Sequence, residues 1–540
     1  MTDKKQNFFD RKTILTFIIV LIIWTAWTHY LDVKYPHQEP PVPAQATQAV
    51  DKGVPANPAV AGVAPPTPTA LLAPSMKAGN AVESFKDYSS PEFSFQLSSL
   101  GMGIKNIDLK KYKTREEQPI VLAKVDQHLP FSSYSLLDNQ ALAFNIEQLD
   151  SNTFRGRAQV GGVEVVKTIK VHPETYSFEV EIDVPNLNEN FKGLVTYVSD
   201  MLVEQKKAGF LAPPIEKQEI FYLHEGTQNR QILAADKSFT TEEPNVSALA
   251  LHLHYFALAI AENSELVPSV KIVKENAQTI LAALIYAKPA LSTAMKIRYT
   301  GFAGPKSFDL LNKVDPRLGG VIDYGMFAVI ARPLLWLMKF FNGLVHNYGL
   351  AIILLTLLVR ALVMPFNIYS FKSMKVMQRL QPEMKALKEK YKDDPAQQNL
   401  KVMELMKANK ANPVGGCLPM LLQLPVFFAL YQTLGQSIEL YREPFVFWIH
   451  DLSFRDPYFV LPVLMGITMF IQQKITPSNM DPQQAKIMQF MPVMFSIFMV
   501  SLPSGLTLYI FISTLFGITQ QYLFLREKTP NHTQAKQVQA

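Results

Sequence analysis

The chain has 540 residues, of which 48% are hydrophobic, and it contains a single cysteine. One thiol excludes a disulfide framework and any metal or iron–sulfur site built from several cysteines. The formal net charge of +6 is unevenly distributed, because residues 345–540 carry 18 Lys and Arg against 11 Asp and Glu. A basic carboxy-terminal third is typical of proteins that meet nucleic acid or the cytoplasmic face of a membrane.

The amino-terminal part predicts a membrane anchor followed by an extended tether. After a basic segment at 1–12, residues 13–31 are almost uncharged and just long enough to span a bilayer. A cleaved signal peptide is the alternative, but the small-residue site at 44–46 lies too far past the apolar run. Residues 32–85 are rich in Pro and Ala, which predicts a tether without a core of its own.

Residues 86–312 show short runs of alternating polar and apolar side chains, separated by turn residues. This period of two predicts one large all-β sandwich domain. His252 and His254 share a strand face, as a metal pair would need, but no carboxylate stands at a suitable spacing, so we expect no metal site. The sequence has no GxxxxGK[ST], GxSxG or HExxH motif, which argues against nucleotide hydrolysis and against these hydrolase classes.

The remaining third is strongly apolar and predicts a polytopic α-helical membrane protein. With the anchor it makes six transmembrane helices, the other five at 349–366, 415–438, 458–473, 487–502 and 505–525. The apolar run at 322–345 is ambiguous, but a span there would put the basic loop 367–414 outside, against the positive-inside rule. We therefore predict an amphipathic helix at the outer interface for 322–345, an outer loop at 439–457, and a cytoplasmic tail at 526–540.

The basic loop 367–414 predicts an antiparallel helical hairpin. Apolar residues recur at three and four positions in each half, and Asp393-Asp394-Pro395 breaks the helix between them. Four flexible methionines, Met377, Met384, Met403 and Met406, suit a surface that receives varied chains. The basic face is either simply solvated or contacts ribosomal RNA or lipid headgroups.

Arg360 is the one charged residue of the predicted span 349–366, and it needs a physical reason to be there. It either snorkels to the cytosolic surface or faces a water-filled cavity, and Thr356, one turn away, favours a polar stripe. Other polar residues in the spans include Gln423 and Ser513. No acidic residue lies deep in a span, which weakens the case for a proton-coupled transporter.

Several motifs in the helical part resemble those of the YidC family of membrane protein insertases. They are Asp323-Tyr324-Gly325, Val359-Arg360, Met364-Pro365, Asn412-Pro413-Val414-Gly415-Gly416-Cys417-Leu418-Pro419, Gln423-Leu424-Pro425-Val426-Phe427, Asp456-Pro457-Tyr458, Asp481-Pro482-Gln483-Gln484-Ala485-Lys486-Ile487-Met488, Phe490-Met491-Pro492 and Pro503-Ser504-Gly505-Leu506. The anchor, tether and outer β-domain, which ends at Gly304-Pro305-Lys306, resemble the Gram-negative form with a large periplasmic domain.

The resemblance implies a five-helix core around a hydrophilic groove that is open to the cytosol and to lipid. Arg360 would hold a substrate's polar tail in this groove, beside Thr356, with Gln423 and Ser513 among its polar residues. Leu424, Phe427 and Tyr509 would form an apolar slide, although Ile510 stands where family members often have a second aromatic residue. The outer domain resembles a sugar-mutarotase-like supersandwich, without a recognisable mutarotase catalytic set.

The resemblance also implies a function without a cofactor and without enzymatic chemistry. A multi-pass protein of the bacterial inner membrane, with both termini cytoplasmic, would insert nascent membrane proteins and help them fold. It would act alone or with the Sec translocon, and the basic hairpin and tail are candidate ribosome contacts. A small-solute transporter and a membrane-tethered sugar-active enzyme remain the alternative functions.

Overall fold

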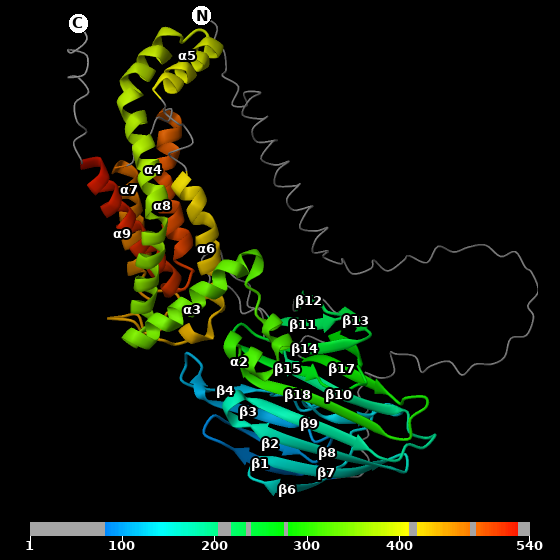
Figure 1. Cartoon of the computed structure of the whole chain (residues 1–540). Helices are drawn as coiled ribbons and strands as arrows, with labels where there is room; N and C mark the ends of the chain where they lie inside the picture. The colour runs from blue at the N-terminus through cyan, green and yellow to red at the C-terminus, as the bar shows by residue number, and fades with distance from the viewer. Residues whose placement is uncertain are drawn as a thin grey trace, which may run out of the picture. The chain divides into compact units, whose positions relative to one another are not determined.

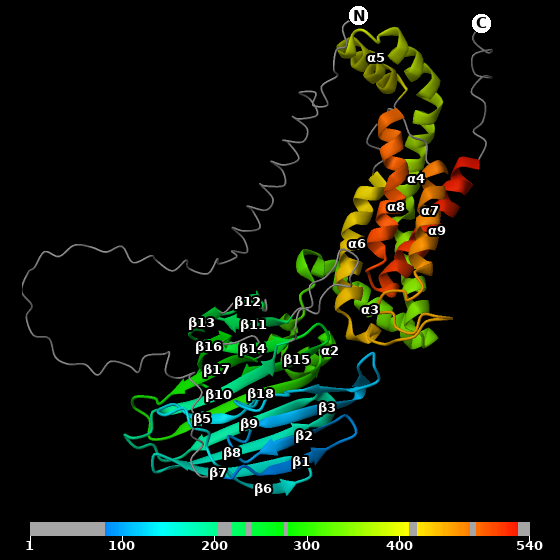
Figure 2. The ribbon, with the colours of Figure 1, turned by 180° about the vertical axis from the view of Figure 1, so that it is seen from behind.

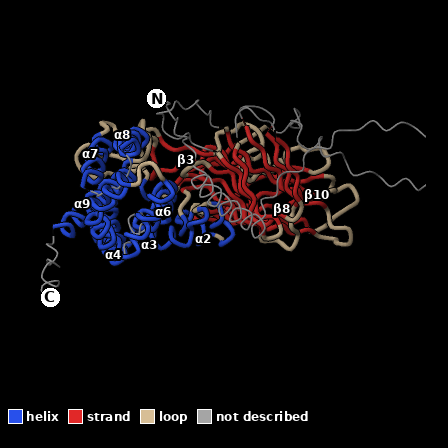
Figure 3. The backbone as a smooth tube through the Cα atoms, turned by 90° about the horizontal axis from the view of Figure 1, so that it is seen from above, coloured by secondary structure: helices blue, strands red, loops and turns tan. Residues whose placement is uncertain are grey.

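The computed structural model describes residues 82–202, 218–233, 239–274, 279–409, 418–475 and 482–526. The predicted anchor, nearly all of the tether and the carboxy-terminal tail lie outside these residues. Among the described residues, every strand precedes residue 306 and every helix longer than two turns follows it (Figure 3). The chain therefore divides into a β-rich part and a helical part.

The β-rich part contains three antiparallel sheets. Its strands are β1 (Phe85–Ser89), β2 (Phe93–Ser98), β3 (Ile104–Lys113), β4 (Pro119–Leu122), β5 (Ser133–Ser135), β6 (Asn145–Asp150), β7 (Thr153–Val160), β8 (Val163–His172), β9 (Ser177–Val184), β10 (Gly193–Met201), β11 (Glu219–His224), β12 (Thr227–Ile232), β13 (Phe239–Glu243), β14 (Val246–His252), β15 (Phe256–Glu262), β16 (Ser269–Lys274), β17 (Thr279–Ala287) and β18 (Met295–Pro305). The sheet orders are β1-β2-β3-β4, then β13-β16-β17-β10-β5, then β12-β11-β14-β15-β18-β9-β8-β7-β6. The prediction of a β-rich domain is confirmed, with strands from Phe85 to Pro305.

The period of two holds only where one face of a sheet is covered. In β8 buried and more exposed residues alternate, as predicted. In β15 every residue is buried, and β14 is buried at all positions but one. Strands covered on both faces lose the alternation, because each of their side chains meets other protein atoms.

The helical part consists of eight α-helices in the described residues, with short 3₁₀ turns between some of them. The helices are α2 (Phe308–Val314), α3 (Ala328–Val345), α4 (Tyr348–Lys390), α5 (Pro395–Ala408), α6 (Leu418–Gln436), α7 (Val460–Ile475), α8 (Pro482–Met499) and α9 (Ser504–Arg526). By length and composition, two segments are able to cross a membrane, Gly325–Val345 and Tyr348–Ile368, and Val460–Ile475 and Gln489–Met499 are shorter apolar helices. The fold is thus β-rich with several apolar helices, and the count of six spans stays a prediction.

Helix α4 does not stop at the predicted end of the span. It runs for 43 residues without a break and forms the first arm of the hairpin, with α5 as the second arm (Figure 1). Figure 2 shows the same continuity from behind. The turn falls at the predicted Asp393–Pro395 break, where the Asp394 carboxylate caps α5 by accepting from the backbone N–H groups of Ala396 and Gln397.

The arms of the hairpin are joined by a small apolar cluster. Leu380, Met384 and Val402 are buried there, with Met377 and Met406 packed around them. Met403 is more than half exposed, so it does not belong to this seam. Three of the four predicted methionines therefore hold the arms together, and the fourth lies on the hairpin surface.

Among the buried lysines of the β-rich part, Lys167 is the most completely enclosed. Lys167 stands on the inward face of β8, in the same alternation as Val165 and Ile169, and it is fully buried. Its Nζ lies within hydrogen-bond distance of four acceptors, the carbonyl oxygens of Gly101 (3.0 Å), Met102 (3.2 Å) and Phe131, and Ser133 Oγ (3.1 Å), which share its N–H groups. Burial holds the pKa of Lys167 well below its usual value. Lys167 therefore ties the β2–β3 turn to the segment that leads into β5.

We predict that Lys167→Met destabilises the protein by about 2–4 kcal/mol, because it leaves several buried acceptors without a donor. The matched control is Lys170→Met on the exposed face of the same strand, which should change stability by less than about 0.5 kcal/mol. Thermal unfolding of the full chain, followed by circular dichroism, measures both. Equal stability of the two variants would show that the bonds of Lys167 contribute nothing.

Candidate functional site

Helices α4 and α9 pack side by side with a constant register. Arg360 bonds to Ser513, Asn367 bonds to Gln520, and the ring of Phe371 stacks on that of Phe524. In each pair the two residues are 153 positions apart. A constant offset requires two parallel helices, and the spacing of four and seven residues is that of a coiled-coil seam.

Arg360 is the centre of a polar network between three helices. Its Nε donates to Ser513 Oγ on α9 at 2.8 Å, and Nε2 of Gln423 on α6 donates to the same oxygen at 3.1 Å. The sequence predicted all three as polar residues of the spans, and the structure brings them together. The guanidinium points at a neighbouring helix, which is not what simple snorkelling to the surface would require.

A second polar pair lies one heptad further toward the hairpin. Asn367 Nδ2 donates to Gln520 Oε1 at 3.2 Å, and both side chains are buried. Asn367 Oδ1 and Gln520 Nε2 are buried without another partner among the described residues. Asn367 was not predicted as a site residue, although it stands seven residues from Arg360, as Gln520 does from Ser513.

Two predicted groove or slide residues, Thr356 and Tyr509, are buried in this structure. The side chain of Thr356 is fully buried, and its hydroxyl donates to the Ile352 carbonyl of its own helix at 2.6 Å. Tyr509 is also buried, and it stands 153 positions from Thr356, the same offset as the α4–α9 pairs. The role of Thr356 in a groove and that of Tyr509 on a slide stay predictions.

The predicted slide residues of α6 differ in their exposure. Leu424 is 43% exposed, whereas Phe427 is partly buried against the core. The ring of Phe427 packs edge-on against that of Phe428, with 5.6 Å between centroids, and Phe428 is 45% exposed. Leu424 and Phe428 are therefore among the exposed apolar residues of α6, and the sequence had not singled out Phe428.

Family models and curated relatives agree on what this chain is similar to. A model described as the YidC periplasmic domain matches residues 88–337, and one described as a 60Kd inner membrane protein matches residues 340–532. A membrane protein insertase YidC from Geobacter metallireducens is 34% identical over 95% of this chain and 97% of its own length. The chain belongs to the YidC family of membrane protein insertases.

Two further comparisons cover different shares of the chain. The YidC of Geotalea daltonii is 48% identical over 281 residues, which are 51% of this chain and 53% of that protein. A crystal structure of an active YidC insertase, with its first transmembrane domain resolved, is 19% identical. It covers 82% of this chain and 95% of its own, with a TM-score of 0.38.

Two of the YidC-like motifs have specific structural roles at the starts of α7 and α9. The Asp456 carboxylate accepts from Trp448 Nε1 (3.0 Å) and from the backbone N–H groups of Tyr458 (3.0 Å) and Leu461 (2.7 Å), so it caps the start of α7. At the start of α9, Gly505 N–H donates to the Leu452 carbonyl at 2.9 Å. A Cβ at Gly505 would lie 3.2 Å from that oxygen, which explains the glycine.

The outer end of α6 is bonded to the β-rich part. His254 Nε2 donates to the Gly435 carbonyl at 2.5 Å, and Lys306 Nζ donates to Gln436 Oε1 at 3.5 Å. Burial lowers the pKa of His254 to about 4, so the imidazole is neutral at physiological pH. His252 Nε2 lies 3.9 Å from Glu219 Oε2, and among the described residues no three His, Cys, Asp or Glu side chains form a metal cluster.

Gly517 on α9 makes room for the polar network of this YidC-family core. A Cβ at Gly517 would lie 3.0 Å from Gln472 Nε2 on α7 and 3.9 Å from Arg360 Nη1. The absence of a side chain therefore lets the guanidinium and an amide from α7 approach α9. In the sequence, its position one turn after Ser513 is the one feature that could have pointed to this glycine.

We predict that Gly517→Leu destabilises the protein by about 1–3 kcal/mol, because its side chain overlaps Gln472 and crowds Arg360. Gly343→Leu on α3 is the matched control, since a Cβ there meets nothing within 4 Å. Thermal unfolding in detergent micelles compares the two variants. A melting temperature for Gly517→Leu as high as that of the control would show that the space is not needed.

Proposed function

We propose that this chain inserts integral membrane proteins into the bacterial inner membrane and helps them fold. The observation that supports this most directly is the convergence of Arg360, Gln423 and Ser513 from three apolar helices. Relatives that share most of its length are named membrane protein insertases. Solute transport therefore has no support beyond the presence of apolar helices.

The mechanism follows from the free energy of moving a polar tail through hydrocarbon. A hydrated groove beside Arg360 would shorten the apolar distance, and the guanidinium would transiently bind acidic groups of the tail. Partition of the substrate's apolar helix into lipid then drives insertion, with the exposed face of α6 at Leu424 and Phe428 as its exit. These steps break and form no covalent bond and use no cofactor.

We also propose six spans, with both termini cytoplasmic and the β-rich part periplasmic. In this topology α3 lies at the outer interface, which its exposed Val329, Trp336 and Phe340 support. The hairpin of α4 and α5 then lies in the cytosol, where its lysines meet anionic surfaces. Its methionines would receive nascent chains, and its basic face is the candidate contact for ribosomes, with the Sec translocon as a lateral partner.

We predict that Arg360→Ala lowers insertion of a substrate with an acidic tail by about tenfold, the loss of one charge-assisted hydrogen bond. Arg360→Lys should retain activity within about threefold, because a diffuse electrostatic role accepts another cation. Insertion into vesicles that contain the purified protein measures the effect. Arg157→Ala, at an exposed position of β7, is the control that should match the unchanged protein.

A comparison of two substrates tests the electrostatic role of Arg360 directly. A substrate with a neutral tail should be less affected by Arg360→Ala than one with an acidic tail. If the two substrates lose activity equally, with the variant folded and present in normal amount, the guanidinium does not bind the tail.

We predict that water reaches Arg360 from the cytosolic side but does not reach its lipid-facing neighbour. In a Cys417→Ser background, a membrane-impermeant maleimide should label a cysteine at 360, because alkylation requires a hydrated thiolate. A cysteine at 357, which is 39% exposed but expected to face lipid, should stay unlabelled, as should one at the buried position 356. Protection of position 360 in a protein that is folded and present in normal amount would contradict the hydrated groove.

A further inference from the structure

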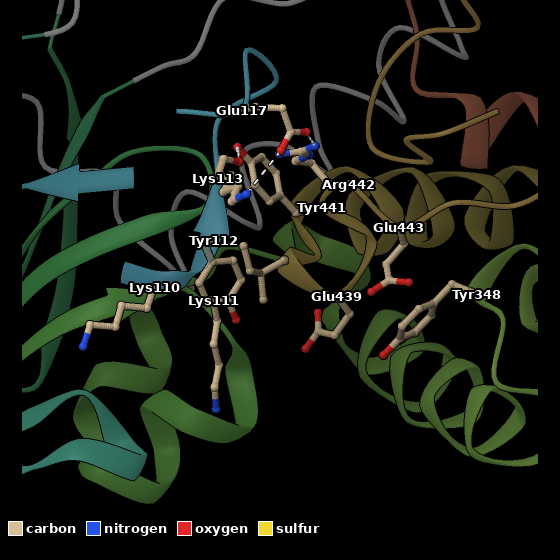
Figure 4. A pocket seen from close by; sticks show the side chains of 11 residues that line it. Lys110, Lys111, Tyr112, Lys113, Glu117, Tyr348, Glu439, Tyr441, Arg442 and Glu443 are labelled. Carbon is tan, nitrogen blue, oxygen red and sulfur yellow. Dashed lines mark hydrogen bonds and ion pairs between the residues drawn. The ribbon is translucent and has the colours of Figure 1, made fainter. Parts of the chain in front are cut away.

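A polar cavity of about 530 Å³ lies where the start of α4 and the segment that follows α6 meet strand β3 (Figure 4). Its lining includes Lys111, Tyr112 and Lys113 from β3, and Tyr348, Glu439 and Glu443 from the helical part. In Figure 4 the carboxylates of Glu439 and Glu443 and the Tyr348 ring lie on one side, with Tyr112 and Lys111 on the other. A third carboxylate of the lining, Glu117, is paired with Arg442 and Lys113.

The cavity lies at the outer end of an apolar helix. Tyr348 is the first residue of α4, whose segment Tyr348–Ile368 is able to cross a membrane. On the neighbouring α3, the exposed rings of Trp336 and Phe340 stack with 5.8 Å between centroids. Exposed aromatic side chains of this kind favour the level of lipid headgroups. Lys339 of the same helix is ion-paired at 2.6 Å with Glu439 in the cavity wall.

The carboxylates of the cavity differ in how they are satisfied. Glu439 accepts from Ser307 Oγ at 3.1 Å in addition to its ion pair with Lys339. The carboxylate of Glu443 has no hydrogen-bond or ion-pair partner among the described residues, and burial raises the pKa of this group. A half-buried carboxylate without a counter-charge is stabilised by a bound cation that donates hydrogen bonds.

The opposite wall carries positive charge that is available to a ligand. The side chains of Lys111 and Lys113 are 59% and 56% exposed. Their ion pairs, with Glu92 at 3.6 Å and Glu117 at 3.5 Å, are surface contacts that contribute little. The cavity therefore offers an acidic group and basic groups to one ligand that has both signs of charge.

We propose that this cavity binds the headgroup of an aminophospholipid from the outer leaflet, with its primary ammonium at Glu443 and its phosphodiester facing Lys111 and Lys113. A primary ammonium has three N–H donors for the carboxylate and the Tyr348 hydroxyl. A choline headgroup has no N–H donor, and a glycerol headgroup has no cation. Phosphatidylethanolamine is therefore the expected ligand, and the proposal does not depend on the insertion mechanism.

Native mass spectrometry of the full-length protein tests this with equimolar phosphatidylethanolamine, phosphatidylcholine and phosphatidylglycerol. The unchanged protein should retain the ethanolamine lipid about tenfold more than the choline lipid, as expected for hydrogen bonds between charged groups. Glu443→Gln should remove this preference. Glu225→Gln, in the exposed β11–β12 turn, is the control and should keep it.

Equal retention of ethanolamine and choline lipids by the unchanged protein, or an unaltered preference in Glu443→Gln, would overturn the proposal. Soluble phosphoethanolamine should not displace the lipid at equal concentration, and displacement would assign the site to a free metabolite instead. Lys111→Gln, at an exposed position, should lower retention of both phospholipids several-fold and serves as the test if Glu443→Gln does not fold. Insertion activity is measured separately, so its loss leaves this result unaffected.

Discussion

A guanidinium inside a bundle of apolar helices has to find hydrogen-bond acceptors on its neighbours, because hydrocarbon offers none. For Arg360 the acceptor is Ser513, and this contact requires α9 to lie beside α4 in one particular register. The same register pairs Asn367 with Gln520. A slip of one residue would break both polar pairs at once, so these contacts specify the alignment of two helices whose apolar surfaces alone would allow several alignments.

The sequence predicted the division of the chain well, and its boundaries less well. Alternation and apolar runs separated the β-rich part from the helices, and Asp394 with Pro395 marked the turn of the hairpin. The predicted span ended at Phe366, where the apolar composition ends, but α4 continues to Lys390 because helix-forming residues continue that far. Apolar composition indicates which part of a segment is surrounded by apolar groups, whereas the length of the helix also depends on backbone propensity.

The candidate site was predicted in part for a similar reason. The sequence identified three polar residues in apolar surroundings, Arg360, Gln423 and Ser513. Asn367 was not predicted, because it lies just beyond the predicted end of its span. The spacing of four residues placed Thr356 on the same helix face as Arg360. Spacing within one helix does not predict which neighbouring helix covers that face. Lys167, by contrast, could have been found, since it breaks the inward apolar face of β8.

Helix α4 is long and continuous, but it contains two positions at which it can bend. Pro365 and Pro382 lie inside the helix, and each removes a backbone hydrogen bond where bending becomes easier. From Pro365 to Lys390 the helix extends about 38 Å, so a bend of about 10° at Pro365 displaces the hairpin end by about 7 Å. Arg360 lies between the start of α4 and Pro365, and its hydrogen bond to Ser513 holds this part of the helix against α9. A chain that pulls on the hairpin would therefore move its tip a long way while the charged centre stays in place.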